Sequence, residues 1–433
     1  MRTWVDGAAG SGFDVDNLPY GVFSRPGEAP RVGVRIGEFV LDLAPVAAAD
    51  VRDGPRAFVA AAEMRDGPRA FEAAAEMRDL HRVFEAASLN ALMAQRRVVR
   101  DSVRRWVTGL LTDQAERGLV EPHLVPVADV LLHLPIEVGD YVDFYASLDH
   151  ASNVGRIFRP DGEPLLPNWR HLPVGYHGRS GTVVGSGTPI IRPRGQRKAP
   201  TDDLPTFGPS TRLDVEAELG FVVGTGSPLG DPVDVDAFAE HVFGVVGLND
   251  WSARDLQAWE YVPLGPFLGK SFATSISRWV TPLEALDAAW VDVPGQDPTP
   301  LPYLLPSGPC GVRGLDIDVE VLLNGEVVSR PPYRTMYWSP AQMLAHLTVN
   351  GASTRTGDLF ASGTISGPRP DQRGSFLELS WGGKEPFGAD VWDGGRTFLE
   401  DGDEVVLRYT APGTGGGRIA LGEVSGRIEP ART

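Results

Sequence analysis

The segment Arg212-Leu-Asp-Val-Glu-Ala-Glu-Leu-Gly-Phe-Val-Val223 decides how the larger part of this chain is expected to fold. Its odd-numbered positions from 213 to 221 are apolar, whereas positions 214, 216 and 218 are carboxylates. Because successive side chains of a β-strand point to opposite faces, this alternation predicts a strand with one buried face and one acidic face. Same-face carboxylates then lie about 6.5–7 Å apart. Taken alone, such a face is typical of a solvated strand surface.

The sequence around this strand is rich in turn residues. The 433 residues include 51 glycines and 37 prolines, which indicates many turns and therefore many short strands. From Pro126 onward, short alternating segments lie between these turns, for example at residues 181–185, 312–323 and 404–409. We therefore predict a mainly β fold with added α-helix.

The first part of the chain has a different pattern. Residues 20–43 alternate short apolar runs with turn residues and predict a small β unit. From Leu80 to Leu119 the apolar residues recur at helical spacing. A single hydrophobic core rarely serves more than about 300 residues. We therefore predict two domains, residues 1–118 and 119–433.

A tandem copy of 13 residues lies between the β unit and the helices. Arg52-Asp-Gly-Pro-Arg-Ala-Phe-Val-Ala-Ala-Ala-Glu-Met64 recurs almost unchanged as residues 65–77. Solenoid repeats are longer, about 20–50 residues, and need several copies to bury a core. The duplication is therefore interpreted as an inserted helical segment and not as a functional repeat.

Charge and cysteine content exclude several classes of function. The net charge of −17 is the wrong sign for neutralising phosphates, so the protein is not expected to bind nucleic acid or an anionic membrane. Cys310 is the single cysteine, which excludes an intrachain disulfide and a thiolate metal cluster. The chain has neither an apolar signal segment at its start nor a run of about 18 apolar residues. A cytoplasmic location is expected.

Further acidic residues suggest that the carboxylates hold a cation. Asp140 and Asp143 lie in Gly-Asp-Tyr-Val-Asp-Phe-Tyr, and Asp250 lies in Leu-Asn-Asp-Trp-Ser. Carboxylates brought together raise one another's pKa unless a cation neutralises them. Oxygen ligands suit Mg²⁺, Ca²⁺ or Mn²⁺ better than Zn²⁺.

A second group of polar residues follows Asp250. Ser252-Ala-Arg-Asp255 has the form of a capping box and predicts a helix through Tyr261. Arg254, Gln257 and Tyr261 fall on one face of that helix. Together with Lys270 they are donors suited to a developing oxyanion.

A histidine is the expected base, and three positions are open. His150 is seven residues from Asp143, and His171 and His177 lie in Asn-Trp-Arg-His-Leu-Pro-Val-Gly-Tyr-His-Gly-Arg. Spacing does not choose among them. The sequence has no Gly-x-Gly-x-x-Gly turn that opens a βαβ unit, no phosphate-binding loop with Gly-Lys-Ser/Thr, and no Gly-x-Ser-x-Gly elbow. These residues favour a divalent-metal enzyme.

At these same residues the sequence resembles the fumarylacetoacetate hydrolase family. The likeness covers nearly the whole chain apart from about residues 45–120, and runs of this length are more specific than short motifs. The matching runs are Asn17-Leu-Pro-Tyr-Gly-Val-Phe-Ser, Gly139-Asp-Tyr-Val-Asp-Phe-Tyr, His150-Ala-Ser-Asn-Val-Gly, residues 166–179, Asn249-Asp-Trp-Ser-Ala-Arg-Asp-Leu-Gln, residues 259–272 and Gly357-Asp-Leu-Phe-Ala-Ser-Gly-Thr-Ile-Ser-Gly.

The resemblance implies a fold, a set of ligands and a set of catalytic groups. The fold is a small SH3-like N-terminal β domain followed by a large C-terminal β-roll domain, usually in a homodimer. Mg²⁺ or Ca²⁺ is expected on Asp143, Glu216, Glu218 and Asp250. A further Mg²⁺ site falls near Asp250, Lys270 and Thr274, where a backbone carbonyl is the expected donor because an ammonium cannot ligate a cation.

The resemblance also implies roles in catalysis and substrate binding. His150 matches the base and Glu378 its orienting partner, and Arg254, Gln257 and Lys270 match the oxyanion donors. Matches to substrate contacts are Tyr145, Arg159, Gln257, Tyr261 and Thr364, of which Arg159 suits a carboxylate.

The implied reaction is hydrolysis of 4-fumarylacetoacetate to fumarate and acetoacetate, the last step of tyrosine and phenylalanine catabolism. The metal would stabilise the leaving carbanion as an enolate. Alternatives are decarboxylation or isomerisation of a related oxo-acid, or metal binding without catalysis. Two features depart from the family: the tandem copy, and Leu148-Asp149, where the family usually carries a basic or amide side chain. Asp149 is expected to raise the pKa of His150.

Overall fold

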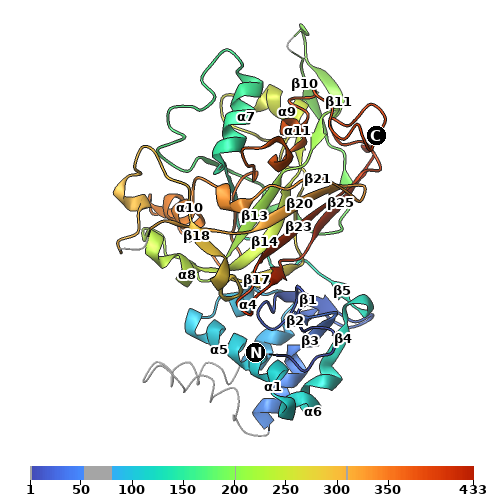
Figure 1. The fold of residues 1–433 in the computed structure, drawn as a ribbon, viewed down its shortest axis with the longest axis vertical. Coiled ribbons are helices and arrows are strands. Elements are labelled where there is room, and N and C mark those ends of the chain that lie inside the picture. The colour runs from blue at the N-terminus through green and yellow to red at the C-terminus, as the bar shows by residue number, and fades with distance from the viewer. Residues whose placement is uncertain (1, 53–79, 200, 309–310) are drawn as a thin grey trace.

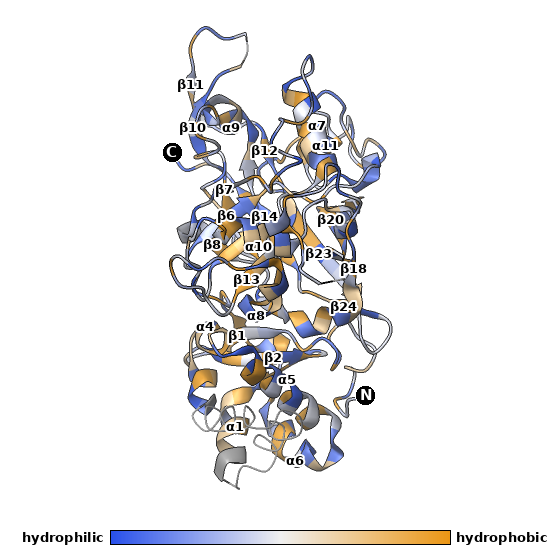
Figure 2. Ribbon diagram, turned by 90° about the vertical axis from the view of Figure 1, so that its left-hand side faces the viewer, coloured by the Kyte–Doolittle hydropathy of each residue, from blue (hydrophilic) through white to orange (hydrophobic). Residues whose placement is uncertain are grey.

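The computed structural model describes residues 2–52, 80–199, 201–308 and 311–433. The tandem copy at residues 52–77 lies outside this description except for Arg52, the last residue of a helix, and Cys310 also lies outside it. In two perpendicular views the N-terminal part forms one end of the molecule, and the later strands and helices form the rest (Figures 1 and 2).

The N-terminal part combines a small antiparallel sheet with helices, as its sequence pattern predicts. The strands pair in the order β4-β3-β2-β1, and β5 pairs with β1. Apolar side chains of α5 pack on this part, among them Val103, Trp106 and Leu110. The elements are β1 (Tyr20–Ser24), β2 (Arg31–Ile36), β3 (Phe39–Asp42), α1 (Leu43–Arg52), α4 (Asn90–Met93), α5 (Arg97–Thr112), α6 (Arg117–Val120), β4 (Leu124–Pro126) and β5 (Leu131–Leu132), with 3₁₀ turns at Leu80–Glu85, Gln114–Glu116, Glu121–His123 and Val127–Asp129.

The N-terminal sheet continues directly into a larger one. Strand β1 pairs antiparallel with β17 (Trp279–Pro282), and the order continues as β17-β14-β13-β22-β6-β7. Strands β4 and β5 lie after residue 118 in sequence but pair with N-terminal strands. The remaining strands of this sheet are β6 (Tyr141–Phe144), β7 (Gly175–His177), β8 (Val183–Gly185), β13 (Ala217–Val223), β14 (Val242–Asp250), β16 (Thr274–Ile276) and β22 (Leu359–Ala361).

The other strands form a second sheet and three short ribbons. The second sheet has the order β21-β20-β23-β25-β9, with β24 beside β23. It contains β9 (Ile190–Ile191), β20 (Asp318–Leu323), β21 (Glu326–Ser329), β23 (Glu404–Pro412), β24 (Arg418–Ala420) and β25 (Val424–Glu429). The ribbons pair β10 (Arg194–Arg197) with β11 (Thr206–Pro209), β12 (Leu213–Asp214) with β15 (Ser252–Ala253), and β18 (Trp290–Asp292) with β19 (Arg313–Leu315).

Helices accompany the strands throughout, so the chain has a mixed α/β fold and the mainly β description is too narrow. The later helices are α7 (Leu148–Phe158), α8 (Phe238–His241), α9 (Arg254–Glu260), α10 (Pro340–Thr348) and α11 (Phe376–Leu379). Short 3₁₀ turns occur at Ser180–Thr182, Val235–Ala237, Leu283–Ala289, Pro302–Leu304, Tyr333–Thr335 and Pro370–Gln372. None of the helices described is long and apolar enough to span a bilayer.

The alternation at 212–223 gives two strands instead of one. Its apolar positions 213, 215, 217, 219 and 221 all lie in the largest hydrophobic core, as predicted. The strand is interrupted between β12 and β13, where Glu216 forms an isolated bridge with Ser375. The acidic positions are buried, so this face is not solvated. Tertiary contacts therefore decide where the strand breaks and what covers its polar side.

A carboxylate on α5 links the N-terminal part to the turn at Leu283–Ala289. The Asp101 side chain, 29% exposed, hydrogen-bonds with Glu284. Burial and the charge of Glu284 raise the pKa of Asp101 to about 6 from an ordinary 3.8. Between pH 3.8 and about 6, Asp101 therefore stays protonated in the folded protein but is ionised in the unfolded chain. The stability that this proton provides is present below pH 3.8 and is lost as the pH rises through about 6.

We expect Asp101→Asn to raise the melting temperature at pH 8 by about 1 °C, because it removes an ionisation that costs about 1 kcal/mol once solvent screening is allowed for. The gain should shrink as the pH approaches 4. Melting curves between pH 4.5 and 8 measure it, with the exposed Glu326→Gln as the control. An equal gain at every pH would contradict the predicted pKa of Asp101.

Candidate active site

Four carboxylates from three segments of the chain meet in the interior. One oxygen each from Asp143, Glu216, Glu218 and Asp250 lies within 4.8 Å of the others, and all four residues are buried. Asp143 lies on β6, Glu218 on β13 and Asp250 at the end of β14, and these strands are linked through β22 in one sheet. Asp140 is exposed and is not part of the group. Sheet pairing thus brings together residues more than 100 positions apart in sequence.

The carboxylate group contains oxygen atoms that nothing in the described chain satisfies. Asp143 Oδ1 and both Glu218 oxygens are buried and accept no hydrogen bond. Burial, together with neighbouring carboxylates, raises the pKa of Asp143 and of Glu218 well above their ordinary values. An oxygen-rich, anionic and unsatisfied group suits a hard divalent cation such as Mg²⁺ or Ca²⁺.

Lys270 and its neighbours contact the same group. Lys270 Nζ forms ion pairs with Glu216 and with Asp250, the latter at 2.8 Å. Thr274 Oγ1 donates to Asp250 Oδ1 at 3.0 Å, and Tyr176 Oη donates to Asp250 Oδ2 at 2.8 Å. Burial opposes the charge of Lys270, but Asp250 and Glu216 raise its pKa above the ordinary value. The lysine therefore stays charged and contributes positive potential to the site.

A histidine and a glutamate form a buried pair beside the carboxylates. Glu378 Oε2 lies 2.6 Å from His150 Nδ1. Burial works against ionisation of Glu378, but His150 and hydrogen bonds from Asn153 and Ser375 lower its pKa. With Nδ1–H donating to the carboxylate, His150 Nε2 is left as the basic nitrogen, 4.0 Å from Glu216 Oε1.

Two short helices hold this pair. Helix α7 begins at Ser147, whose side chain accepts from His150 N, and α11 carries Glu378. The two helices lie side by side in both views (Figures 1 and 2). His150 is buried and lines the cavity, whereas His171 and His177 are exposed and do not line it. Asp149 lies in the first turn of α7.

Helix α9 places the expected oxyanion donors, although it begins differently from the prediction. Ser252 lies in β15 and donates to Asp250 O, so the predicted capping box is wrong. Instead the Asp255 carboxylate accepts hydrogen bonds from Ser210 and Thr211. The capping pattern failed because pairing with β12 holds Ser252 in an extended strand.

Arg254 is tightly held at the start of α9. Its Nε donates to Asp214 at 2.7 Å, and Nη1 donates to Gln257 Oε1 at 3.1 Å. Nη2 is paired with Glu216 at 2.7 Å. Burial is outweighed by Glu216 and Asp214, which raise the pKa of Arg254. The guanidinium is therefore charged and fixed in direction.

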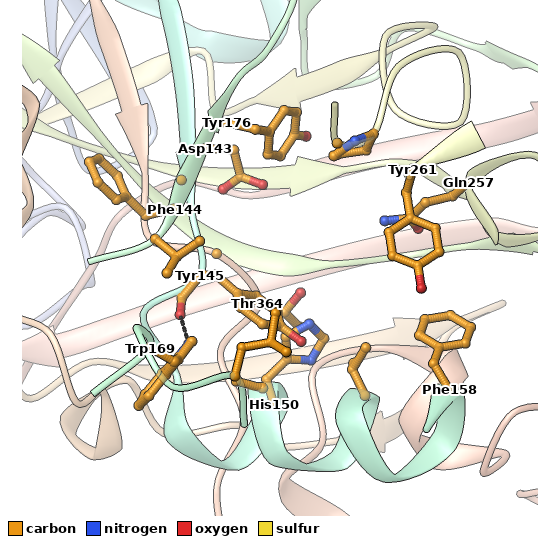
Figure 3. A pocket seen from close by; sticks show the side chains of 18 of the residues that line it. Asp143, Phe144, Tyr145, His150, Phe158, Trp169, Tyr176, Gln257, Tyr261 and Thr364 are labelled. Atoms are coloured by element: carbon orange, nitrogen blue, oxygen red, sulfur yellow. Dashed lines mark hydrogen bonds between the residues drawn. The ribbon is translucent and has the colours of Figure 1, made fainter. Parts of the chain in front are cut away.

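These groups line one cavity of about 360 Å³. Figure 3 shows His150 on its helix, Asp143 and Tyr176 across the cavity, and Gln257 and Tyr261 opposite Phe158. Predicted site residues on its wall are Asp143, Tyr145, His150, Arg159, Glu216, Glu218, Arg254, Gln257, Tyr261, Lys270 and Thr364. Asp250 and Thr274 contact this group from behind, and Glu378 binds His150.

The cavity wall offers unpaired polar atoms to a ligand. Thr364 Oγ1 and Arg159 Nε are buried without a hydrogen-bond partner in the described chain. Gly363, at φ +74°, lies directly against Phe144: a Cβ added to Gly363 would lie 2.2 Å from the Phe144 carbonyl oxygen. Sequence reasoning did not assign roles to Asp214, Asn153 or Tyr176. The acidic face of the 212–223 segment was the available signal for Asp214.

Sequence comparison agrees with this geometry. Residues 16–135 match the fumarylacetoacetase N-terminal family, and residues 141–428 match the fumarylacetoacetate (FAA) hydrolase C-terminal family. The chain is 44% identical to fumarylacetoacetase of Rattus norvegicus and 43% identical to that of Homo sapiens, with 99% of each chain covered. This chain belongs to the fumarylacetoacetase family.

Solved structures of other family members support the fold. Fumarylacetoacetate hydrolase from Exiguobacterium antarcticum aligns with a TM-score of 0.52 over 96% of this chain and 100% of that one, at 18% identity. Such low identity supports the fold alone. The fumarylacetoacetase family relationship itself rests on the full-length sequence matches, which include the rice protein at 42% identity over 100% of this chain and 98% of that one.

Cation binding is tested most directly on the unsatisfied residue Glu218. We expect Mg²⁺ or Ca²⁺ to raise the melting temperature of the protein and a chelator to reverse the rise, because bound ligand stabilises only the folded state. The Glu218→Gln variant should need at least ten times more cation for the same rise in melting temperature. The matched control is Asp140→Asn, which changes an exposed acid near the site. Equal cation responses of Glu218→Gln and the unmodified protein would contradict the site.

Proposed function

We propose that this protein hydrolyses 4-fumarylacetoacetate to fumarate and acetoacetate, the last step of tyrosine and phenylalanine catabolism. The observation that carries the proposal is that the His150–Glu378 pair and the carboxylate group open into the same cavity. Full-length identity of 44% to the rat fumarylacetoacetase supports the same substrate. A base next to a cation site and several fixed donors is the set of groups that hydrolysis of a β-diketone needs.

The proposed reaction begins with a water molecule as the nucleophile. His150 Nε2 takes a proton from water while the water oxygen attacks the ketone carbon of the fumaryl group, which becomes a carboxyl carbon of fumarate. Glu378 holds the imidazole in the required tautomer and stabilises its positive charge. The carbon–carbon bond then breaks, fumarate is released as the acid product, and the proton on His150 is available to the carbon of the leaving acetoacetate.

Charge that develops on the carbonyl oxygen needs fixed donors. We assign this role to Arg254, Gln257 and Lys270, which line the cavity. Asp143, Glu216, Glu218 and Asp250 would hold Mg²⁺ or Ca²⁺, with a further Mg²⁺ near Lys270 and Thr274. The cation when bound supplies Lewis-acid polarisation of the diketone oxygens.

The substrate carboxylates need their own partners. We assign Arg159 to one of them, because its Nε is buried and unpaired while Nη2 donates to Pro164 O at 3.0 Å. Tyr145, Gln257, Tyr261 and Thr364 complete the substrate contacts that we propose. The Tyr145 ring packs edge-on against the His150 ring at 5.3 Å between centroids, so substrate binding and the base are close together.

Several finer predictions accompany this function. We propose an SH3-like N-terminal β domain and a C-terminal β-roll domain, divided as residues 1–118 and 119–433, in a homodimer. Strand β4 pairs with β3 and strand β5 pairs with β1, so the N-terminal sheet includes residues as late in the sequence as Leu132. The cytoplasmic location and the absence of nucleic-acid and membrane partners stay predictions.

The decisive experiment is loss of diketone ultraviolet absorbance when fumarylacetoacetate is added to the purified protein, with Mg²⁺ or Ca²⁺ and with chelator. His150→Ala should lower kcat by about 10²–10⁴-fold, because water then lacks its base. The control His171→Ala changes an exposed histidine and should retain the rate. Full activity of His150→Ala would refute the assignment of the base. Products other than fumarate and acetoacetate would favour a related oxo-acid decarboxylase or isomerase, and no turnover would favour a metal-binding protein.

Arg159→Gln should raise KM for fumarylacetoacetate about tenfold or more, because a charge-assisted pair is replaced by a neutral contact. Steady-state kinetics measure the change. Arg156→Gln is the matched control, since Arg156 is exposed in the last turn of α7, just before Arg159. An unchanged KM in Arg159→Gln would show that another group binds the carboxylate.

A further inference from the structure

Asp214 is a fully buried carboxylate outside the group that would hold the cation. Its Oδ1 accepts from Val215 N at 2.8 Å and Phe376 N at 2.7 Å. Its Oδ2 accepts from Leu377 N at 3.0 Å and Arg254 Nε at 2.7 Å. We infer that Asp214 is a positioning residue, which holds the oxyanion donor Arg254 and the helix of Glu378 in one fixed arrangement. This inference rests on the proposed hydrolase function.

On one side, Asp214 determines the direction of a guanidinium. With Nε bound to Asp214, the Arg254 plane places Nη1 on Gln257 Oε1 and Nη2 on Glu216. Because the Gln257 oxygen is occupied, its amide N–H groups remain for the cavity that Gln257 lines. Asp214 thus aligns two of the three proposed oxyanion donors without itself lining the cavity.

The second role of Asp214 is to stabilise the short helix α11 through hydrogen bonds to its N-terminus. Helix α11 has four residues, Phe376–Leu379, too few to be stable by its own hydrogen bonds. Its first two N–H groups bind Asp214, and Ser375 Oγ accepts from Glu378 N at 3.3 Å. Glu378 on this helix binds His150, so a displacement of α11 would move the base.

Only a carboxylate can accept hydrogen bonds from Arg254 and from the N-terminus of α11 at the same time. It offers two acceptor oxygens, whereas an amide offers one oxygen and one NH₂ group. In Asp214→Asn the NH₂ group must face either Arg254 Nε and Leu377 N or Val215 N and Phe376 N, and in either case donors meet donors. The local backbone has separate support, because Asp214 pairs with Ser252 across β12 and β15 and Arg254 N donates to Arg212 O at 2.9 Å. The substitution therefore disturbs side-chain direction more than the chain path.

The test compares turnover of fumarylacetoacetate by the unmodified protein and by Asp214→Asn. We expect kcat to fall about 100-fold, KM to change less than threefold, and the cation-induced rise in melting temperature to remain. The matched control is Asp42→Asn, a buried carboxylate that binds Arg31 Nε at 2.9 Å in the N-terminal sheet. This variant also removes a buried charge that is paired with an arginine, but far from the cavity, and should retain kcat.

A double-mutant cycle separates positioning from general destabilisation. If Asp214 acts through Arg254, Asp214→Asn should slow the Arg254→Gln variant less than tenfold, instead of 100-fold. Fully multiplicative losses, or an unchanged kcat in Asp214→Asn, would overturn the inference while leaving the hydrolase function in place. Absence of turnover by the unmodified protein would overturn the function and this inference together.

If Asp214→Asn does not give a native near-ultraviolet circular dichroism spectrum, Arg254→Lys tests the same link. Lysine keeps the charge but lacks the guanidinium fork that joins Asp214, Glu216 and Gln257. We expect a comparable fall in kcat with KM nearly constant. A full rate in Arg254→Lys would overturn the inference.

Discussion

The structure depends on gathering like charges in its interior. Four carboxylates meet within 4.8 Å, where burial of each ion costs several kcal/mol without compensation. Lys270 and Arg254 offset part of this cost through ion pairs to Glu216 and Asp250. Their ion pairs do not include Asp143 or Glu218, and Asp143 Oδ1 and both Glu218 oxygens accept no hydrogen bond in the described chain. A divalent cation is the group whose charge and preferred ligands correct this imbalance, so the metal, the base and the oxyanion donors are parts of one electrostatic arrangement.

Strand β13 connects this charged site to the two larger hydrophobic cores. Leu219 and Phe221 on one face pack in the larger core, while Val222 on the other face packs in the core that contains α5. Glu218 shares its face with Val222 and stands at the site. Between them Gly220 is closely packed, since an added Cβ would lie 3.0 Å from a methyl carbon of Val246. The N-terminal part therefore covers the same sheet face that carries Glu218. Hydrogen bonds between β1 and β17 join the N-terminal sheet to the larger sheet.

The sequence predicted the features that depend on neighbouring residues and missed those that depend on contacts between distant segments. Parity along 212–223 correctly separated the apolar positions from the acidic ones, because alternation is a property of any strand. The capping box at Ser252 failed because a tertiary strand pairing replaced a local helix signal. Spacing could not choose His150 over His171 and His177, since burial and the contact with Glu378 join segments 228 residues apart. Asp214 was found only as one more acidic position, and its four hydrogen bonds become evident only when α9 and α11 are placed around it.

By itself the sequence determined the family, the apolar face of the 212–223 segment and the residue types that such a site needs. These follow from local periodicity and from long runs shared with relatives. Tertiary structure alone decided which carboxylates remain unsatisfied, which histidine is held by a glutamate, and which direction Arg254 points. Those properties depend on distances between strands that are far apart in the chain, and charge interactions change steeply with distance and burial.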